Sequence, residues 1–185
     1  MQELSMHVLD VAENSVAAGA KLVHITLEAD AARDLLALTI EDDGKGMDPQ
    51  VAAQVTDPFY TTRTTRKVGL GLPLLKMAAE LTGGEMHLQS QPGKGTKVCA
   101  RFGLSHIDRA PLGDMASTVG GLIQCSPQID FVYTVRTPDG EFVADTRQLR
   151  EILGDVPLSE PAVAQWVREY IDENTRPILQ RSNLI

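Results

Sequence analysis

Four short segments, most of them containing glycine, follow one another in an order that constrains this chain more than any other feature of its sequence. They are Asp10-x-x-x-Asn14, then Asp42-Asp43-Gly44-Lys45-Gly46, then Gly69-Leu70-Gly71-Leu72, and finally Pro92-Gly93-Lys94-Gly95-Thr96. Each segment alone is an ordinary turn or helix start. Taken together, they predict a pocket that holds an adenine nucleotide and its magnesium ion.

The first segment lies in a predicted helix and places three polar side chains on one face. His7, Asp10 and Asn14 fall at positions i, i+3 and i+7. Polar groups on a face that packs against a sheet require partners, because burying them alone is costly. The amide oxygen of Asn14 suits a magnesium ion that bridges phosphates, and Asp10 could act as a general base. The alternatives are that Asp10 pairs with His7 or lies exposed, and that Asn14 lies on a solvated face.

The second segment supplies a base-recognition group. Asp42 ends a predicted strand, and its carboxylate can accept a hydrogen bond from the N6 amine of adenine, whereas the O6 atom of guanine would repel it. Gly44 and Gly46 allow close backbone approach and positive φ. By itself this spacing is an ordinary turn in many proteins.

The third segment and its neighbours suit phosphate oxygens. Gly69-Leu70-Gly71-Leu72 directly precedes a predicted helix, so its backbone amides and the positive helix end can bind an anion. Arg63, Arg66 and Lys67 could pair with phosphates when the preceding loop closes. The alternatives are a close-packed helix start and a solvated cationic loop.

The four segments resemble the N, G1, G2 and G3 boxes of the GHKL superfamily, which includes gyrase, the heat-shock chaperone, sensor histidine kinases and MutL. The resemblance covers residues 1–104 and implies an α/β fold: a two-layer α/β sandwich (the Bergerat ATP-binding fold), with a mixed, mostly antiparallel sheet and three helices on one face. It implies ATP and Mg²⁺ as cofactors. Thr96 matches the family residue that helps to hold adenine through its hydroxyl group and a water molecule. Phe59, in a string that resembles the kinase F box, would be the hinge of a lid.

Two branches of the superfamily are represented. Residues 12–20 resemble the MutL and gyrase sequences, and the glutamate that activates water in that branch is replaced by the shorter Asp10. Histidine kinases usually have a lysine three residues after the asparagine, where this chain has Ala17, yet the lid segment resembles theirs. The resemblance implies an ATP-binding regulator that acts on a separate protein by phosphorylation or conformational control. The alternatives are an ATP-hydrolysing conformational switch of the MutL and gyrase type, and an ATP sensor without turnover.

A further string, His106-x-x-Arg109-x-Pro111-Leu112, has the spacing of the kinase phosphoacceptor box. Ile107 occupies the position of the acidic base, and the string follows a predicted strand instead of lying within a helix. We therefore expect a linker histidine, with phosphoacceptor status as the alternative.

Composition excludes several classes of protein. Hydrophobic residues make up 43% of the chain and charged residues 23%, as in soluble globular proteins. The net charge of −8 without a basic block argues against nucleic acid as a partner. No segment approaches the roughly 18 apolar residues of a membrane span, and no basic and apolar leader is present. We expect a cytoplasmic chain with no membrane partner, an unidentified protein partner, and room for a homodimer.

The extent of the resemblance divides the chain into two parts. Residues 1–104 are expected to form a histidine-kinase-like ATPase domain, and residues 105–185 a small C-terminal α+β extension for protein interaction. Periodicity and turn residues predict helices over 4–18, 49–55, 73–81, 114–124, 146–153 and 160–174, and strands over 21–29, 34–41, 86–90, 97–102, 130–136 and 141–145.

Overall fold

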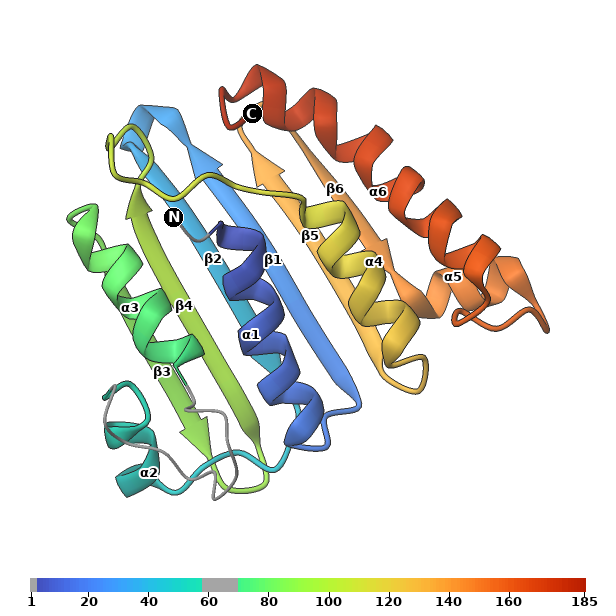
Figure 1. Ribbon diagram of the computed structural model, residues 1–185, viewed down its shortest axis with the longest axis horizontal. Helices are drawn as coiled ribbons and strands as arrows, with labels where there is room; N and C mark the ends of the chain where they lie inside the picture. The colour runs from blue at the N-terminus through green and yellow to red at the C-terminus, as the bar shows by residue number, and fades with distance from the viewer. Residues whose placement is uncertain (1–2, 58–69) are drawn as a thin grey trace.

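The computed structural model describes residues 3–57 and 70–185, and it contains one mixed sheet (Figure 1). Its strand order is β3-β4-β2-β1-β5-β6, and every neighbouring pair is antiparallel except β1 and β5. The strands are β1 (Leu22–Asp30), β2 (Leu35–Asp42), β3 (Glu85–Gln91), β4 (Gly95–Gly103), β5 (Asp130–Thr137) and β6 (Gly140–Asp145). The predicted α/β class and mostly antiparallel sheet are confirmed.

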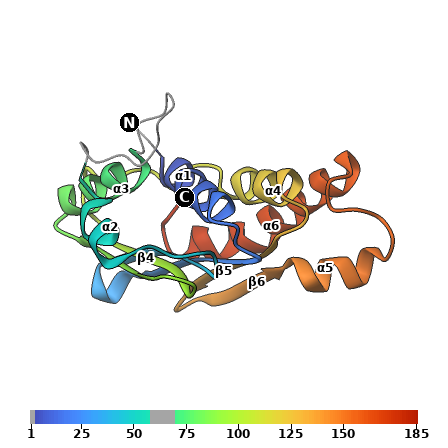
Figure 2. The ribbon, with the colours of Figure 1, turned by 90° about the horizontal axis from the view of Figure 1, so that it is seen from below.

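The helices of the described residues are α1 (Leu4–Ala17), α2 (Pro49–Gln54), α3 (Gly71–Leu81), α4 (Met115–Cys125), α5 (Thr146–Leu153) and α6 (Pro161–Arg181), with a short 3-10 turn η1 (Ala31–Arg33) between β1 and β2. Helices α1, α3, α4 and α6 form a second layer on one face of the sheet (Figure 2). Helix α1 packs between α3 and α4, and α6 continues the row beside α4. The layer over the described sheet therefore has four helices, one more than expected, because α6 also packs on β5 and β6.

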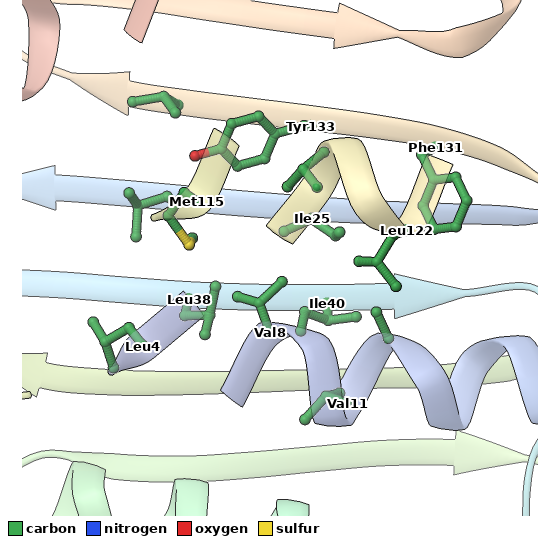
Figure 3. Packing of buried hydrophobic residues seen from close by; sticks show 14 of the residues in the cluster. Leu4, Val8, Val11, Ile25, Leu38, Ile40, Met115, Leu122, Phe131 and Tyr133 are labelled. Carbon is green, nitrogen blue, oxygen red and sulfur yellow. The ribbon is translucent and has the colours of Figure 1, made fainter. Parts of the chain in front are cut away.

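Alternation along the central strands explains the two layers. In β1, Val23, Ile25 and Leu27 are buried, whereas the residues between them point to the other face. This period of two is that of a half-buried strand. Figure 3 shows the buried side chains of β1, β2 and β5 meeting those of α1 and α4.

The opposite face of the sheet is polar. Cross-strand ion pairs lie along it, each between side chains that are about half exposed, so water screens their attraction and each contributes little to stability. They are Lys97–Glu41 (2.9 Å), Arg101–Glu85 (3.3 Å), Arg136–Glu28 (4.0 Å) and Arg136–Glu141 (2.5 Å).

The C-terminal part of the chain joins the same sheet as the N-terminal part. Strand β5 runs parallel to β1, with Leu22 to Glu28 paired to Asp130 to Arg136. The predicted boundary after residue 104 falls in the turn that follows β4. Residues 105–185 thus extend the first sheet by two strands, and the division into two units stays a prediction.

Two helix boundaries differ from the expectation. Helix α3 begins at Gly71, two residues before Pro73. Helix α6 was expected to end at residue 174 but continues to Arg181 through Pro177. Buried Thr175 and Leu179 on either side of the proline explain this continuation, since packing of these side chains offsets the one backbone hydrogen bond that proline removes. No helix in residues 3–57 or 70–185 is long and apolar enough to cross a membrane.

Candidate nucleotide-binding site

A cavity of about 500 Å³ lies between α1, α2, the start of α3 and the adjoining ends of β2 and β4. Five of the predicted residues line it: Asn14, Asp42, Gly46, Leu72 and Thr96. They come from all four sequence segments, which the fold brings together. A larger hollow of about 840 Å³ on the β3 edge shares Asp42 and Thr96 but is shallower and lacks Asn14. We place the site in the deeper cavity for that reason.

The carboxylate of Asp42 is held by two donors. The hydroxyl of buried Ser15 donates to Oδ2 at 2.6 Å, and the backbone N–H of Gly44 donates to Oδ1 at 2.9 Å. Each oxygen keeps a further lone pair, so the group can still accept a hydrogen bond from an amine. Sequence reasoning missed Ser15. Its position directly after Asn14, on the sheet-facing side of α1, was the available signal.

Thr96 lies opposite Asp42 in the register of β2 and β4. Its hydroxyl is 2.9 Å from that of Ser90, which also lies 3.0 Å from the carbonyl oxygen of Gly95 and accepts the N–H of Met47 at 2.8 Å. If Ser90 gives its one proton to Gly95, Thr96 donates to Ser90 and keeps its lone pairs for a ligand. Ser90, which joins the second and fourth segments, was also missed.

The glycines of the second and fourth segments pack backbone against backbone. Gly46 has φ +66°, and a Cβ there would lie 1.9 Å from the carbonyl oxygen of Gln91. Gly95 has φ +88°, and a Cβ there would lie 1.8 Å from the carbonyl oxygen of Asp42. Gly44 does not have a positive φ, and glycine is required there only by close packing, since a Cβ would lie 2.9 Å from that of Ala18. The two segments therefore form one rigid wall.

Asp10 lies against the start of α3. A Cβ at Gly71 would lie 2.9 Å from that of Asp10, so the third segment closes directly onto the first. His7, one turn earlier, is only 2% exposed. Burial lowers the pKa of His7, and the charge of Asp10 partly opposes this. No hydrogen bond or ion pair joins His7 to Asp10 in the described part of the chain, and Nδ1 of His7 has no partner there.

The remaining predicted residues divide into two groups. Leu70 is the N-cap residue of α3, and its carbonyl accepts the N–H of Leu74 at 2.9 Å. Phe59, Arg63, Arg66, Lys67 and Gly69 lie outside the described residues.

His106 lies at the far end of the sheet from the cavity. Thr96 stands near the start of β4 and His106 follows its last residue, Gly103, in a turn where the N–H of Asp108 donates to Nδ1 of His106 at 3.2 Å. At about 3.3 Å per residue, the seven steps from Thr96 to Gly103 span roughly 23 Å. A phosphate bound in the cavity is therefore out of reach of His106 in the same chain.

Within the described ranges no group of three or more histidine, cysteine, aspartate or glutamate side chains could hold a metal ion. Asn14 lines the cavity. Magnesium is usually held by one or two protein oxygens together with phosphates and water. The single amide oxygen fits that mode of binding.

Comparison with known proteins identifies the family. The model of the family described as histidine kinase-, DNA gyrase B- and HSP90-like ATPase matches residues 2–106, more than half of the chain. Sensor protein kinase FleS of Pseudomonas aeruginosa is 40% identical over 105 residues, which are 57% of this chain and 25% of that protein. A putative sensor protein of Shewanella frigidimarina is 36% identical over 85 residues (45% and 13%), and sporulation kinase C of Bacillus subtilis is 27% identical over 94 residues (51% and 22%). The chain spans a quarter or less of the length of these relatives.

A solved structure extends the likeness in fold. The N-terminal domain of a DNA repair protein matches 77% of this chain and 52% of its own, with a TM-score of 0.57 and 16% identity. That share is larger than the stretch matched by the family model, so part of the region after residue 106 takes part in the same fold. The chain belongs to the histidine kinase-, DNA gyrase B- and HSP90-like ATPase family, and its matched region is a histidine-kinase-like ATP-binding domain with the superfamily's sandwich fold.

Proposed function

We propose that this protein binds ATP with Mg²⁺ in the cavity and regulates a separate protein, either by phosphorylating it or by an ATP-dependent change of conformation. The observation that carries the proposal is the carboxylate of Asp42, fixed by Ser15 and Gly44 on the wall that also presents Thr96 and Asn14. A carboxylate fixed in this way can accept a hydrogen bond from the N6 amine of adenine, whereas it would repel the O6 atom that guanine has at the same position.

Each predicted residue has a place in this proposal. Asp42 and Thr96 hold adenine, with Gly44 and Gly46 shaping the wall beneath it. The amide oxygen of Asn14 binds the magnesium ion, which neutralises phosphate charge. The amides of Gly69, Leu70, Gly71 and Leu72 bind phosphate oxygens at the start of α3. Phe59, Arg63, Arg66 and Lys67 belong to a lid that closes over the phosphates.

Transfer of phosphate would go to another protein. Two of the relatives are named as kinases, sensor protein kinase FleS and sporulation kinase C, which supports phosphorylation. The separation of His106 from the cavity argues against that histidine as an acceptor within its own chain.

The position of Asp10 supports a second candidate, slow hydrolysis that drives a conformational switch. Its side chain packs against Gly71 at the start of α3, beside the place where phosphates would bind. A carboxylate there can accept a proton from attacking water. An ATP sensor without turnover is the third candidate.

Calorimetry tests the binding. The purified chain with Mg²⁺ should bind ATP and discriminate strongly against GTP. No heat with ATP, or equal affinity for the two nucleotides, would refute the proposed site.

Incubation with γ-labelled ATP and a partner separates the three candidates. Label on the partner supports phosphorylation. Phosphate release that Asp10→Asn abolishes supports the switch. Binding without either outcome supports the sensor.

The partner and the assembly belong to the same proposal. We expect an unidentified cytoplasmic protein partner, an interaction role for residues 105–185, and a homodimer as one possible assembly. A pull-down from lysate with and without ATP would identify partners that depend on the nucleotide.

A further inference from the structure

We propose that Lys45 is a nucleotide-binding residue whose ammonium group contacts the phosphate chain of ATP; this inference rests on the function proposed for the cavity. Lys45 is the only lysine or arginine among the described residues that line the cavity. Asp42 and Asp48 are the only carboxylates there. Without Lys45, this part of the wall would therefore present only negative charge to a polyanion.

Neither of these two carboxylates forms an ion pair with Lys45. Asp42 accepts hydrogen bonds from Ser15 and Gly44, and Asp48 accepts the N–H of Gln50 at 3.0 Å as the N-cap of α2. Across residues 3–57 and 70–185, no carboxylate comes within ion-pair distance of Lys45. Lys45 is exposed and lines the cavity, so its positive charge is available to an anionic ligand.

The backbone of Lys45 is held on both sides, so its side chain starts from a fixed point. Its N–H donates to the carbonyl of Ala18 at 3.0 Å, and its carbonyl accepts the N–H of Gly93 at 2.7 Å. The neighbouring Gly46 is locked against Gln91. Binding therefore requires ordering of the lysine side chain alone, and not of its loop.

The residues of α1 that line the cavity near Lys45 carry no charge. Ala17 and Ala18, at the end of α1, line the same cavity and carry no charge. Ala17 occupies the position where the kinase pattern has lysine. The second segment thus supplies a cation to the cavity that these two residues of α1 line without charge.

The cation also lies near the C-terminus of α1, where the helix dipole favours positive charge. A purely structural role there predicts lower stability on neutralising Lys45, with equal effects on all ligands. A phosphate contact instead predicts an effect that depends on the charge of the ligand.

Calorimetry with ATP, ADP and adenosine on matched variants tests the inference. Lys45→Gln should weaken ATP binding about tenfold, as expected for one charge-assisted contact, while adenosine affinity stays within about twofold. Lys21→Gln is the control, since Lys21 carries the same charge and is exposed but lines neither this cavity nor the adjoining hollow. It should leave both affinities unchanged. Raising the salt concentration should shrink the difference between Lys45→Gln and the wild type.

A rescue experiment separates charge from shape. Ala17→Lys in the Lys45→Gln background should recover part of the lost ATP affinity, and Lys45→Arg should retain most of it. Thermal melting confirms that each variant is folded. Unchanged ATP affinity in Lys45→Gln, or equal losses for ATP and adenosine, overturns the role of Lys45 while the proposed function stands. A wild-type chain that binds no ATP overturns the proposed function itself.

Discussion

At the scale of single residues, the site depends on how neighbours hold two ionisable side chains on the chain's first half. Asp42 is exposed to the cavity but anchored through both oxygens. Asp43, the next residue, points away and accepts the N–H groups of Lys21 and Leu22 at 2.7 and 2.9 Å. Burial alone would raise the pKa of Asp43, but these N–H groups lower it below its usual value. The two adjacent aspartates therefore have different roles: Asp42 faces the cavity, and Asp43 stabilises the fold through its hydrogen bonds to the backbone.

Asp42→Asn should lose base discrimination. The amide can place an N–H where the carboxylate accepted a hydrogen bond, and losing one such bond to a charged group costs about 1.5–3 kcal/mol. We expect ATP affinity to fall by roughly tenfold to a hundredfold and the preference over GTP to narrow. Calorimetry with both nucleotides measures this.

The matched control is Asp43→Asn, which should lower stability in urea but keep the preference for ATP. Loss of preference in both variants would show that the two carboxylates do not differ in role.

His7 should make the protein sensitive to acid. Because burial lowers its pKa in the folded state, the unfolded chain takes up a proton at higher pH than the folded chain does. Stability should be unaffected by His7 above about pH 6.5 and should fall as the pH drops below that value toward the folded-state pKa. Urea unfolding between pH 5 and 7.5 measures the slope.

His7→Gln removes the titrating group and should flatten the slope in that window. Equal slopes in the wild type and His7→Gln would contradict the assignment.

At the scale of elements, the wall of the site is a contact between two loops. Gly46→Ala should be strongly destabilising, since a Cβ would overlap a backbone carbonyl and the positive φ alone costs about 1–3 kcal/mol. Reduced ATP affinity should accompany the lower midpoint of urea unfolding.

Gly121→Ala is the control for Gly46→Ala. Gly121 lies within α4, where an added Cβ meets nothing within 4 Å. That change should be neutral or stabilising by up to about 1 kcal/mol. Similar midpoints for the two variants would mean that the loop contact is not required.

At the scale of the whole molecule, one sheet spans both halves of the chain. A chain ending at residue 104 would expose the edge of β1 and remove the side chains of α4 and β5 that cover Ile25. We expect it to be less stable than the full chain and prone to association through the new edge. Urea unfolding and sedimentation of the two chains measure this, and equal stability would show that residues 1–104 fold independently.

Local spacing predicted much of this protein. The order of the four segments, the period of two in β1 and β2, and the helical period of α1 are properties of neighbouring residues, so they are visible in the sequence. Close approach and positive φ were predicted for Gly44 and Gly46; both lie close to neighbouring atoms, but of the two only Gly46 has a positive φ. The length of α6 was wrong because buried side chains beyond Pro177 override a local signal.

What the sequence determined by itself was the set of chemical groups and their order: an amide, a carboxylate, glycine turns and a hydroxyl. Only the tertiary structure decided their partners, such as Ser15 on Asp42, Ser90 on Thr96, Lys45 at the rim of the cavity and β5 beside β1. These contacts join residues that are from 6 to more than 100 positions apart, and no local period encodes them. They follow from the packing of one helical layer on one sheet, which brings the ends of separate strands to a common edge.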